Sequence, residues 1–85
     1  MNGHRYQIEY GPSAIEDLDC LPARERAQIL RKIERLQNGL HGNIKRLQQH
    51  EAMYRLRMGD YRILFEAEGD VMVIRRIGNR KDVYD

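Results

Sequence analysis

Near the N-terminus of the chain, apolar and polar residues alternate. Tyr6, Ile8 and Tyr10 are separated by polar side chains, which is the period of a half-buried strand, and a Gly-Pro pair ends the pattern. Ser13 and Glu16 then have the spacing of a capping box, which predicts the start of a first helix. The apolar residues expected on one face of this helix are Ala14, Ile15, Leu18 and Leu21.

A second helix is predicted from Pro22, because proline fits the first turn of a helix. The pair Asn38 and Gly39 should end it. Its apolar residues follow the 3.6-residue period: Ala27, Ile29, Leu30, Ile33, Leu36 and Leu40. The two helices should form an antiparallel hairpin. Residues 41–52 show no sustained period and are predicted to be a loop of about a dozen residues, near the length at which loops tend to have a function.

The rest of the sequence predicts three strands joined by tight turns. In residues 52–58 the side chains alternate between two faces, and in residues 61–66 they alternate again. Gly59 and Asp60 between them form a two-residue turn with glycine first, as a type II′ turn requires. After a second turn at residues 68–70, residues 71–77 are almost continuously apolar, which is typical of an interior strand.

The order of these elements predicts an α+β fold. An N-terminal strand, a helical hairpin and a three-stranded antiparallel meander should form one domain over residues 1–85. We expect one antiparallel sheet of about four strands with the helix pair on one of its faces.

Composition restricts the class of protein. With 85 residues and 41% hydrophobic content, the chain is near the lower limit for a self-sufficient core. It has neither an apolar run of about 18 residues nor a secretory signal, so we expect a cytoplasmic protein without a membrane partner. Cys20 is the only cysteine, which excludes an intramolecular disulfide, and we interpret it as a small buried hydrophobe. No zinc-site spacing is present, and no metal or cofactor is expected.

The net charge of +2 arises entirely after residue 44. Residues 1–44 hold six Lys and Arg against six Asp and Glu, whereas residues 45–85 hold nine against seven. Such a modest basic surface fits a phosphate-bearing partner, but it is not the dense basic stripe of a protein that binds duplex DNA.

The arginines of the meander should gather on one face. If the apolar residues of the first two strands face the helices, Arg55, Arg57 and Arg62 share the opposite face, and the tight turn makes Arg57 and Arg62 neighbours. A solvated sheet face simply needs polar residues, which is the alternative explanation. However, clustered cations repel one another, and Glu66 is the only obvious counter-charge. Guanidinium groups at this spacing suit an extended anion such as a phosphate chain.

The C-terminal residues extend this interpretation. After Gly78 the chain can bring Arg80, Lys81 and Tyr84 back over the sheet, although Tyr84 could instead cover the edge of the core. Bases stack on tyrosine while arginines hold phosphates, so single-stranded nucleic acid is the expected ligand class.

Three further cations are candidates for binding the same phosphate chain, and we call the row of cations along it the cationic track. Lys45 and Arg46 lie in the predicted loop and either extend the track or are ordinary solvated residues. Arg76 shares the parity of Met72 and Ile74, so whether it or its neighbour Arg75 joins the active face depends on the strand register.

The segments YRLRMGDYRILFE and GNRKDVY, preceded by a strand and a helical hairpin, resemble toxins of the RelE/ParE superfamily from type II toxin–antitoxin pairs, in particular the RelE-like branch. The resemblance covers nearly the whole chain. It implies a RelE-like, microbial-ribonuclease-type fold and a ribosome-dependent mRNA endoribonuclease that cuts the codon in the A site. ParE-like members act on DNA gyrase instead.

The resemblance also implies roles for individual residues. Arg55 and Arg57 occupy the positions of two basic active-site residues, and Arg62 that of the phosphate-clamping arginine. Arg80 occupies the position of the arginine proposed as general acid, and Tyr84 that of the base-stacking tyrosine.

The chemistry that the resemblance implies is metal-independent. The 2′-hydroxyl of the RNA attacks the adjacent phosphodiester and gives a 2′,3′-cyclic phosphate. Some members carry lysine where this chain has Arg55 and Arg57, and a guanidinium does not readily act as a base because its pKa lies above about 12. The general base is therefore open among His50, Glu51, Lys81 and Tyr84.

The implied partners are a cognate antitoxin, with a toxin–antitoxin heterotetramer as one assembly, and the ribosome with its mRNA. Two alternatives stay open at this point: a ParE-like gyrase inhibitor, and a module that binds RNA or protein without catalysis.

Overall fold

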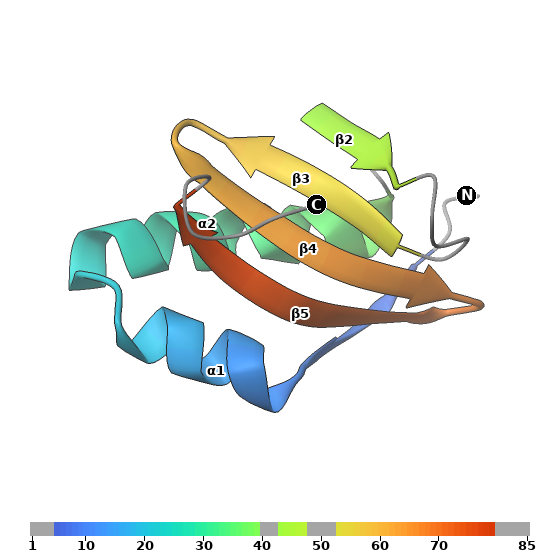
Figure 1. Cartoon of the computed structure of the whole chain (residues 1–85). Coiled ribbons are helices and arrows are strands. Elements are labelled where there is room, and N and C mark those ends of the chain that lie inside the picture. Colours follow the sequence, from blue (N-terminus) through green and yellow to red (C-terminus); the bar gives the residue numbers. More distant parts are fainter. Residues whose placement is uncertain (1–4, 40–42, 48–52, 80–85) are drawn as a thin grey trace.

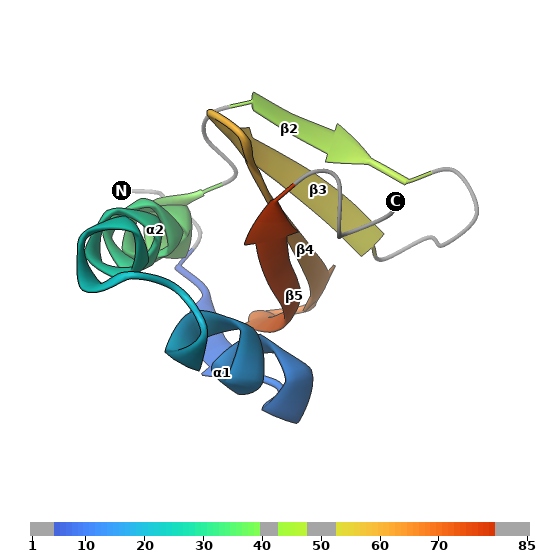
Figure 2. The same ribbon diagram turned by 60° about the vertical axis from the view of Figure 1, so that its left-hand side comes forward.

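The computed structural model describes residues 5–39, 43–47 and 53–79, and places both helices on one side of a five-stranded sheet (Figures 1 and 2). The strands lie in the order β1-β5-β4-β3-β2. Along the chain the elements are β1 (Gln7–Tyr10), α1 (Pro12–Asp19), α2 (Ala23–Arg35) with a 3₁₀ turn (Leu36–Asn38), β2 (Asn43–Arg46), β3 (Met53–Met58), β4 (Tyr61–Glu68) and β5 (Val71–Asn79). The predicted α+β class is confirmed, and the predicted strand, helices and meander occur in the predicted order, with β2 as an additional strand.

The hydrophobic core lies between the helices and one face of the sheet. Ile29 and Ile33 from α2 pack with Leu56, Phe65 and Ile74 from the three central strands, and all five are fully buried. Because strand side chains alternate between faces, burial of these residues on one face leaves the intervening residues on the other.

The sheet differs from the predicted one in two respects. The predicted loop contains β2, a four-residue strand that pairs antiparallel with β3 along the edge of the sheet. In addition, β1 pairs parallel with β5, so the sheet is mixed rather than wholly antiparallel. Four residues are too few for a visible period, and β2 depends on hydrogen bonds to β3 rather than on a pattern of its own. The direction of β1 depends on how the chain returns after the helices, which no local pattern records.

Helix α1 corrects three local predictions. It begins at Pro12 after the N-cap residue Gly11, so Ser13 lies inside the helix and makes no capping box. Ile15 is 49% exposed, because only the line through Ala14 and Leu18 meets the core of this short helix. Cys20 follows the last turn and is exposed, so the interpretation as a buried hydrophobe was wrong.

Two tight turns set the register of the meander. Gly59 has a φ of +57°, while no non-glycine residue in the described part of the chain has a positive φ. A positive φ at the first central residue only is the signature of the predicted type II′ turn. The turn at Gly69, also with a φ of +57°, follows the same rule and joins β4 to β5.

A β-bulge shifts the parity of β5. Phe65 pairs with Ile74, but the preceding residue, Leu64, pairs with Arg76, which leaves Arg75 as the extra residue. Ile74 and Ile77 are therefore both buried although three positions separate them. Simple alternation along the strand predicted that Arg76 would share the face of Ile74. The bulge instead places Arg76 on the opposite face.

The core position of Phe65 makes a prediction about stability. Phe65→Ala should lower the free energy of unfolding by about 3–5 kcal/mol, since the side chain is fully buried between helices and sheet. Ile15→Ala, at the exposed apolar position on α1, should change it by about 0.5 kcal/mol or less. Urea denaturation of both variants measures the difference, and equal losses would contradict the described core.

Candidate nucleic-acid interface

Arg55, Arg57 and Arg62 lie together on the sheet face opposite the helices. Arg57 and Arg62 are direct partners across the β3–β4 pair. Arg55 lies two residues from Arg57 on β3, on the face that Leu56 does not share. The predicted geometry of these three residues is confirmed, while their roles in catalysis stay predictions.

The electrostatics of the cluster are those of crowded cations. The pKa of Arg55 is lowered, first by burial and then by the charges of Arg62 and Arg57. The Nε atoms of all three arginines are shielded from solvent, and that of Arg57 donates no hydrogen bond. Because guanidinium groups in proteins carry a positive charge, the three neighbouring arginines repel one another, and a bound anion would relieve that repulsion.

Strand β2 adds a cation that the sequence placed in a loop. Lys45 pairs with Arg55, and directly opposed residues of an antiparallel pair share a face, so Lys45 joins the cluster. Arg46 pairs with Tyr54, so it belongs to the opposite face of the sheet and does not join the cluster. The available signal was weak: a single Ile44 between polar residues.

The sheet face opposite the helices, which we call the open face, also has an apolar centre. Leu64 is only 7% exposed although it lies outside the main core, on the same face as Arg62. It pairs with Arg55 on one side and with Arg76 on the other. The cationic residues of this face therefore surround an aliphatic side chain.

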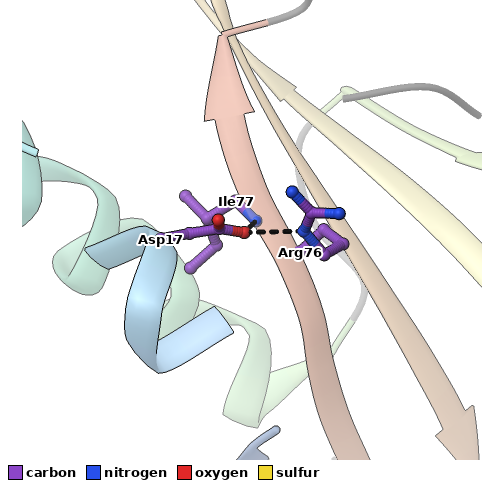
Figure 3. Close-up of polar contacts among 3 residues, drawn as sticks. All are labelled: Asp17, Arg76 and Ile77. Atoms are coloured by element: carbon purple, nitrogen blue, oxygen red, sulfur yellow. Dashed lines mark hydrogen bonds and ion pairs between the residues drawn. The ribbon is translucent and has the colours of Figure 1, made fainter. Parts of the chain in front are cut away.

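The two adjacent arginines of β5 have different carboxylate partners. Arg75, the bulge residue, forms an ion pair with Glu66, so Glu66 is not simply the counter-charge of the three-arginine cluster that the sequence indicated. Arg76 donates from Nε to Asp17 Oδ2 at 2.9 Å, and Ile77 N donates to the same oxygen at 2.8 Å (Figure 3). The pKa of Arg76 is raised, chiefly by this hydrogen bond to Asp17. Sequence analysis missed Asp17, which lies 59 residues away from Arg76 along the chain.

Several candidate residues lie outside the described part of the chain: Arg80, Lys81, Tyr84, His50 and Glu51. The last described residues of β5 lie beside the cluster, because Gly78 pairs with Arg62 and Asn79 with Tyr61. Among the described residues, no three His, Cys, Asp or Glu side chains gather as metal ligands. In the same part of the chain, no helix is long and apolar enough to cross a bilayer.

Comparison with known proteins agrees with this architecture. Residues 8–84 match the sequence model of a family described as the ParE toxin of the type II toxin–antitoxin system parDE. The chain belongs to the RelE/ParE toxins of type II toxin–antitoxin systems. It is 33% identical to Toxin RelE3 of Methanocaldococcus jannaschii, in an alignment that covers 93% of this chain and 96% of that one.

Solved structures place the toxin in the RelE-like branch. It superimposes on a chain of the RelB–RelE antitoxin–toxin complex from Methanococcus jannaschii with a TM-score of 0.76 and 33% identity, covering 91% of this chain and 95% of that one. A chain of the RelBE2 complex from Mycobacterium tuberculosis gives a TM-score of 0.79 at 26% identity, with 92% and 94% covered.

The crowded arginines make a prediction about salt. Adding salt at low ionic strength should stabilise the toxin, and Arg57→Gln should reduce that gain, because the opposed pair Arg57 and Arg62 costs about 0.2–1 kcal/mol when unscreened. Thermal unfolding at about 10 mM and about 500 mM NaCl measures this, because the Debye length falls from about 30 Å at the lower concentration to less than about 8 Å at the higher one. Arg24→Gln on α2 is the charge-matched control, and an equal salt response in both variants would contradict the described repulsion.

Proposed function

We propose that this toxin is a ribosome-dependent mRNA endoribonuclease that cleaves codons in the A site. The observation that supports it most is the gathering of Arg55, Arg57, Arg62 and Lys45 on a single sheet face, opposite the helices. A face of this kind suits the closely spaced phosphates of a single strand, which offer several anionic groups to neighbouring guanidinium forks.

The proposed reaction uses the RNA's own 2′-hydroxyl as nucleophile. The 2′-oxygen bonds to the adjacent phosphorus as the bond to the 5′-oxygen breaks, which leaves a 2′,3′-cyclic phosphate and a 5′-hydroxyl. Arg62 stabilises the charge that develops on the phosphorane, with Arg55 and Arg57 beside it. Arg80 protonates the leaving oxygen and Tyr84 stacks on a base, by resemblance to related toxins.

The proposed need for the ribosome follows from what arginines cannot do. None of the three clustered arginines is a plausible base, since each stays protonated. The base is therefore one of His50, Glu51, Lys81 and Tyr84, or a group of the ribosome. We infer that the ribosome orients the nucleotide in line for attack while the toxin contributes charge. Because this partner is the ribosome, we propose that the toxin acts in the cytoplasm.

A second candidate function is inhibition of DNA gyrase, because the matching family is described as ParE toxin. A gyrase inhibitor needs the fold but no convergent catalytic cluster. Toxicity that survives loss of the arginines, with intact mRNA and damaged DNA, would favour this function.

The proposed partner is an antitoxin of the RelB type, which accompanies the related toxins in their solved complexes. The cationic face favours an antitoxin segment that carries carboxylates near Arg55, Arg57 or Arg62, with aliphatic anchors on the helices or the sheet edge. A heterotetramer of two toxins and two antitoxins is one assembly consistent with such pairs.

The test of the proposed reaction is a map of mRNA 5′ ends after induction of the toxin. We expect cuts inside translated codons and none in protein-free RNA. Arg62→Ala and Arg80→Ala should each lower the cleavage rate about 100-fold, the scale for loss of a preorganised charge donor. Arg24→Ala on α2 should have little effect. Efficient cleavage of naked RNA would refute ribosome dependence, and equal losses in all three variants would indicate general destabilisation.

Binding of the antitoxin should stabilise the toxin and stop cleavage together. A ligand that binds only the folded state adds RT ln(1 + [L]/Kd) to the free energy of unfolding, about 4 kcal/mol at a thousandfold excess over Kd. Melting curves and cleavage assays of the toxin, with and without the product of the adjacent gene, measure both effects. A stabilised complex that cleaves at the rate of the free toxin would contradict the neutralising role.

A further inference from the structure

Among the residues that the structure describes, the C-terminal half of β5 has no neighbouring strand on its β1 side. β1 pairs with Val71–Ile74 only, and Gly11 N donates to Ile74 O at 2.9 Å as the chain leaves β1. Beyond this point the Asp17 carboxylate of α1 accepts the hydrogen bond of Ile77 N at 2.8 Å. A side chain thus replaces a strand at this edge (Figure 3).

The same carboxylate oxygen also orients Arg76. Its Oδ2 accepts from Arg76 Nε at 2.9 Å, and the Asp17 side chain is 19% exposed whereas that of Arg76 is 48% exposed. The carboxylate is therefore held against the protein while the guanidinium reaches solvent. Figure 3 shows Nε turned toward Asp17 and the two Nη atoms on the side of the guanidinium that points away from Asp17.

The register connects Arg76 to the arginine cluster. Lys45 pairs with Arg55, Arg55 with Leu64, and Leu64 with Arg76, so these four residues form a row across the sheet. Arg55 and Arg76 are two strands apart, or about 10 Å between backbones. Arg76 is the cation at the β5 end of this row.

A hollow beside Arg76 offers room for a ligand. It has a volume of about 280 Å³ and lies between the end of α1 and the C-terminal half of β5. Among the described residues, Asp17 and Arg76 line it together with Tyr61, Ile77 and Gly78. Arg76 is thus both a lining residue of this hollow and the cation at the β5 end of the row.

We infer that Asp17 is a positioning residue that holds Arg76 to bind a phosphate of single-stranded RNA, next to the phosphate bound by the arginine cluster. This inference rests on the proposed RNA substrate. Asp17 binds Nε and so leaves the two Nη groups to donate to phosphate. Because this contact already restricts the Arg76 side chain, less conformational entropy is lost when the RNA binds.

The sign of one substitution separates positioning from simple electrostatics. Asp17→Asn adds one positive charge to the toxin, and charge alone would strengthen RNA binding. A more loosely held guanidinium has the opposite effect. The asparagine oxygen can still accept from both Ile77 N and Arg76 Nε, but it carries no charge, so the substitution weakens the contact to the guanidinium more than the contact to the backbone amide.

The experiment compares Asp17→Asn, Arg76→Ala and the double variant, with Asp19→Asn as a control that makes the same charge change on the same helix. Two quantities are measured: the single-turnover cleavage rate on translating ribosomes and the affinity for an uncleavable 2′-O-methyl oligonucleotide. We expect Asp17→Asn to lower both by about threefold to tenfold and Arg76→Ala by about tenfold, the range for the net contribution of one hydrogen bond. Asp19→Asn should lower neither, and Asp17→Asn should add nothing to Arg76→Ala.

Several outcomes would overturn the inference. Equal behaviour of the two aspartate variants would show that only net charge matters. A loss from Asp17→Asn that persists in the Arg76→Ala background would assign Asp17 to strand anchoring alone. If Asp17→Asn fails to fold, Arg76→Lys, which keeps the charge and the Ile77 bond, should show the same loss, and its full activity would refute the inference.

Failure of the proposed function gives a different result. A wild-type toxin that cleaves nothing, yet binds the oligonucleotide with the pattern expected of the variants, would refute the reaction and retain the positioning role. A wild-type toxin that neither cleaves mRNA nor binds the oligonucleotide would refute both.

Discussion

The two-residue turn at Gly59 and Asp60 is the constraint on which the candidate interface depends. Because the turn joins β3 to β4 without a spare residue, Met58 must pair with Tyr61 and Arg57 with Arg62. The alternation of strand side chains then assigns every second residue of both strands to the core and the others to the open face. One added residue in the turn would change the register and move Arg62 to the face opposite Arg55 and Arg57.

The two faces of this hairpin have opposite energetic roles. Leu56, Ile63 and Phe65 are fully buried against the helices and stabilise the sheet. On the other face, Arg57 and Arg62 are held opposite one another by the same backbone and repel. Full burial of one such apolar side chain contributes about 1.5–3 kcal/mol, which exceeds the cost of about 0.2–1 kcal/mol for one opposed pair of like charges. In the function that we propose, this crowding would prepare the face for an anion, because the repulsion is relieved when the anion binds.

The row of residues across the open face ends at β2 on one side and at β5 on the other, and different contacts hold the cation at each end. At one edge, β2 adds Lys45 to the row through main-chain pairing with β3. At the other end of the row, a carboxylate from α1 takes the place of a strand and contacts Arg76. The helices thus serve as more than a cover for the core, because α1 also supplies a polar contact to the strand that ends beside Arg62.

Local sequence determined the helices, the meander, its type II′ turn and the shared face of Arg55, Arg57 and Arg62, since each follows from a period or a turn rule acting over a few residues. Tertiary structure alone decided the pairing of β2, the parallel direction of β1 and the contact between Asp17 and Arg76. These features join residues far apart in the chain, and neither periodicity nor spacing records such partners. The bulge at Arg75 belongs to the same group: it reverses the parity of β5 because Ile74 and Ile77 both fill the core between sheet and helices, and that packing exists only in the folded chain.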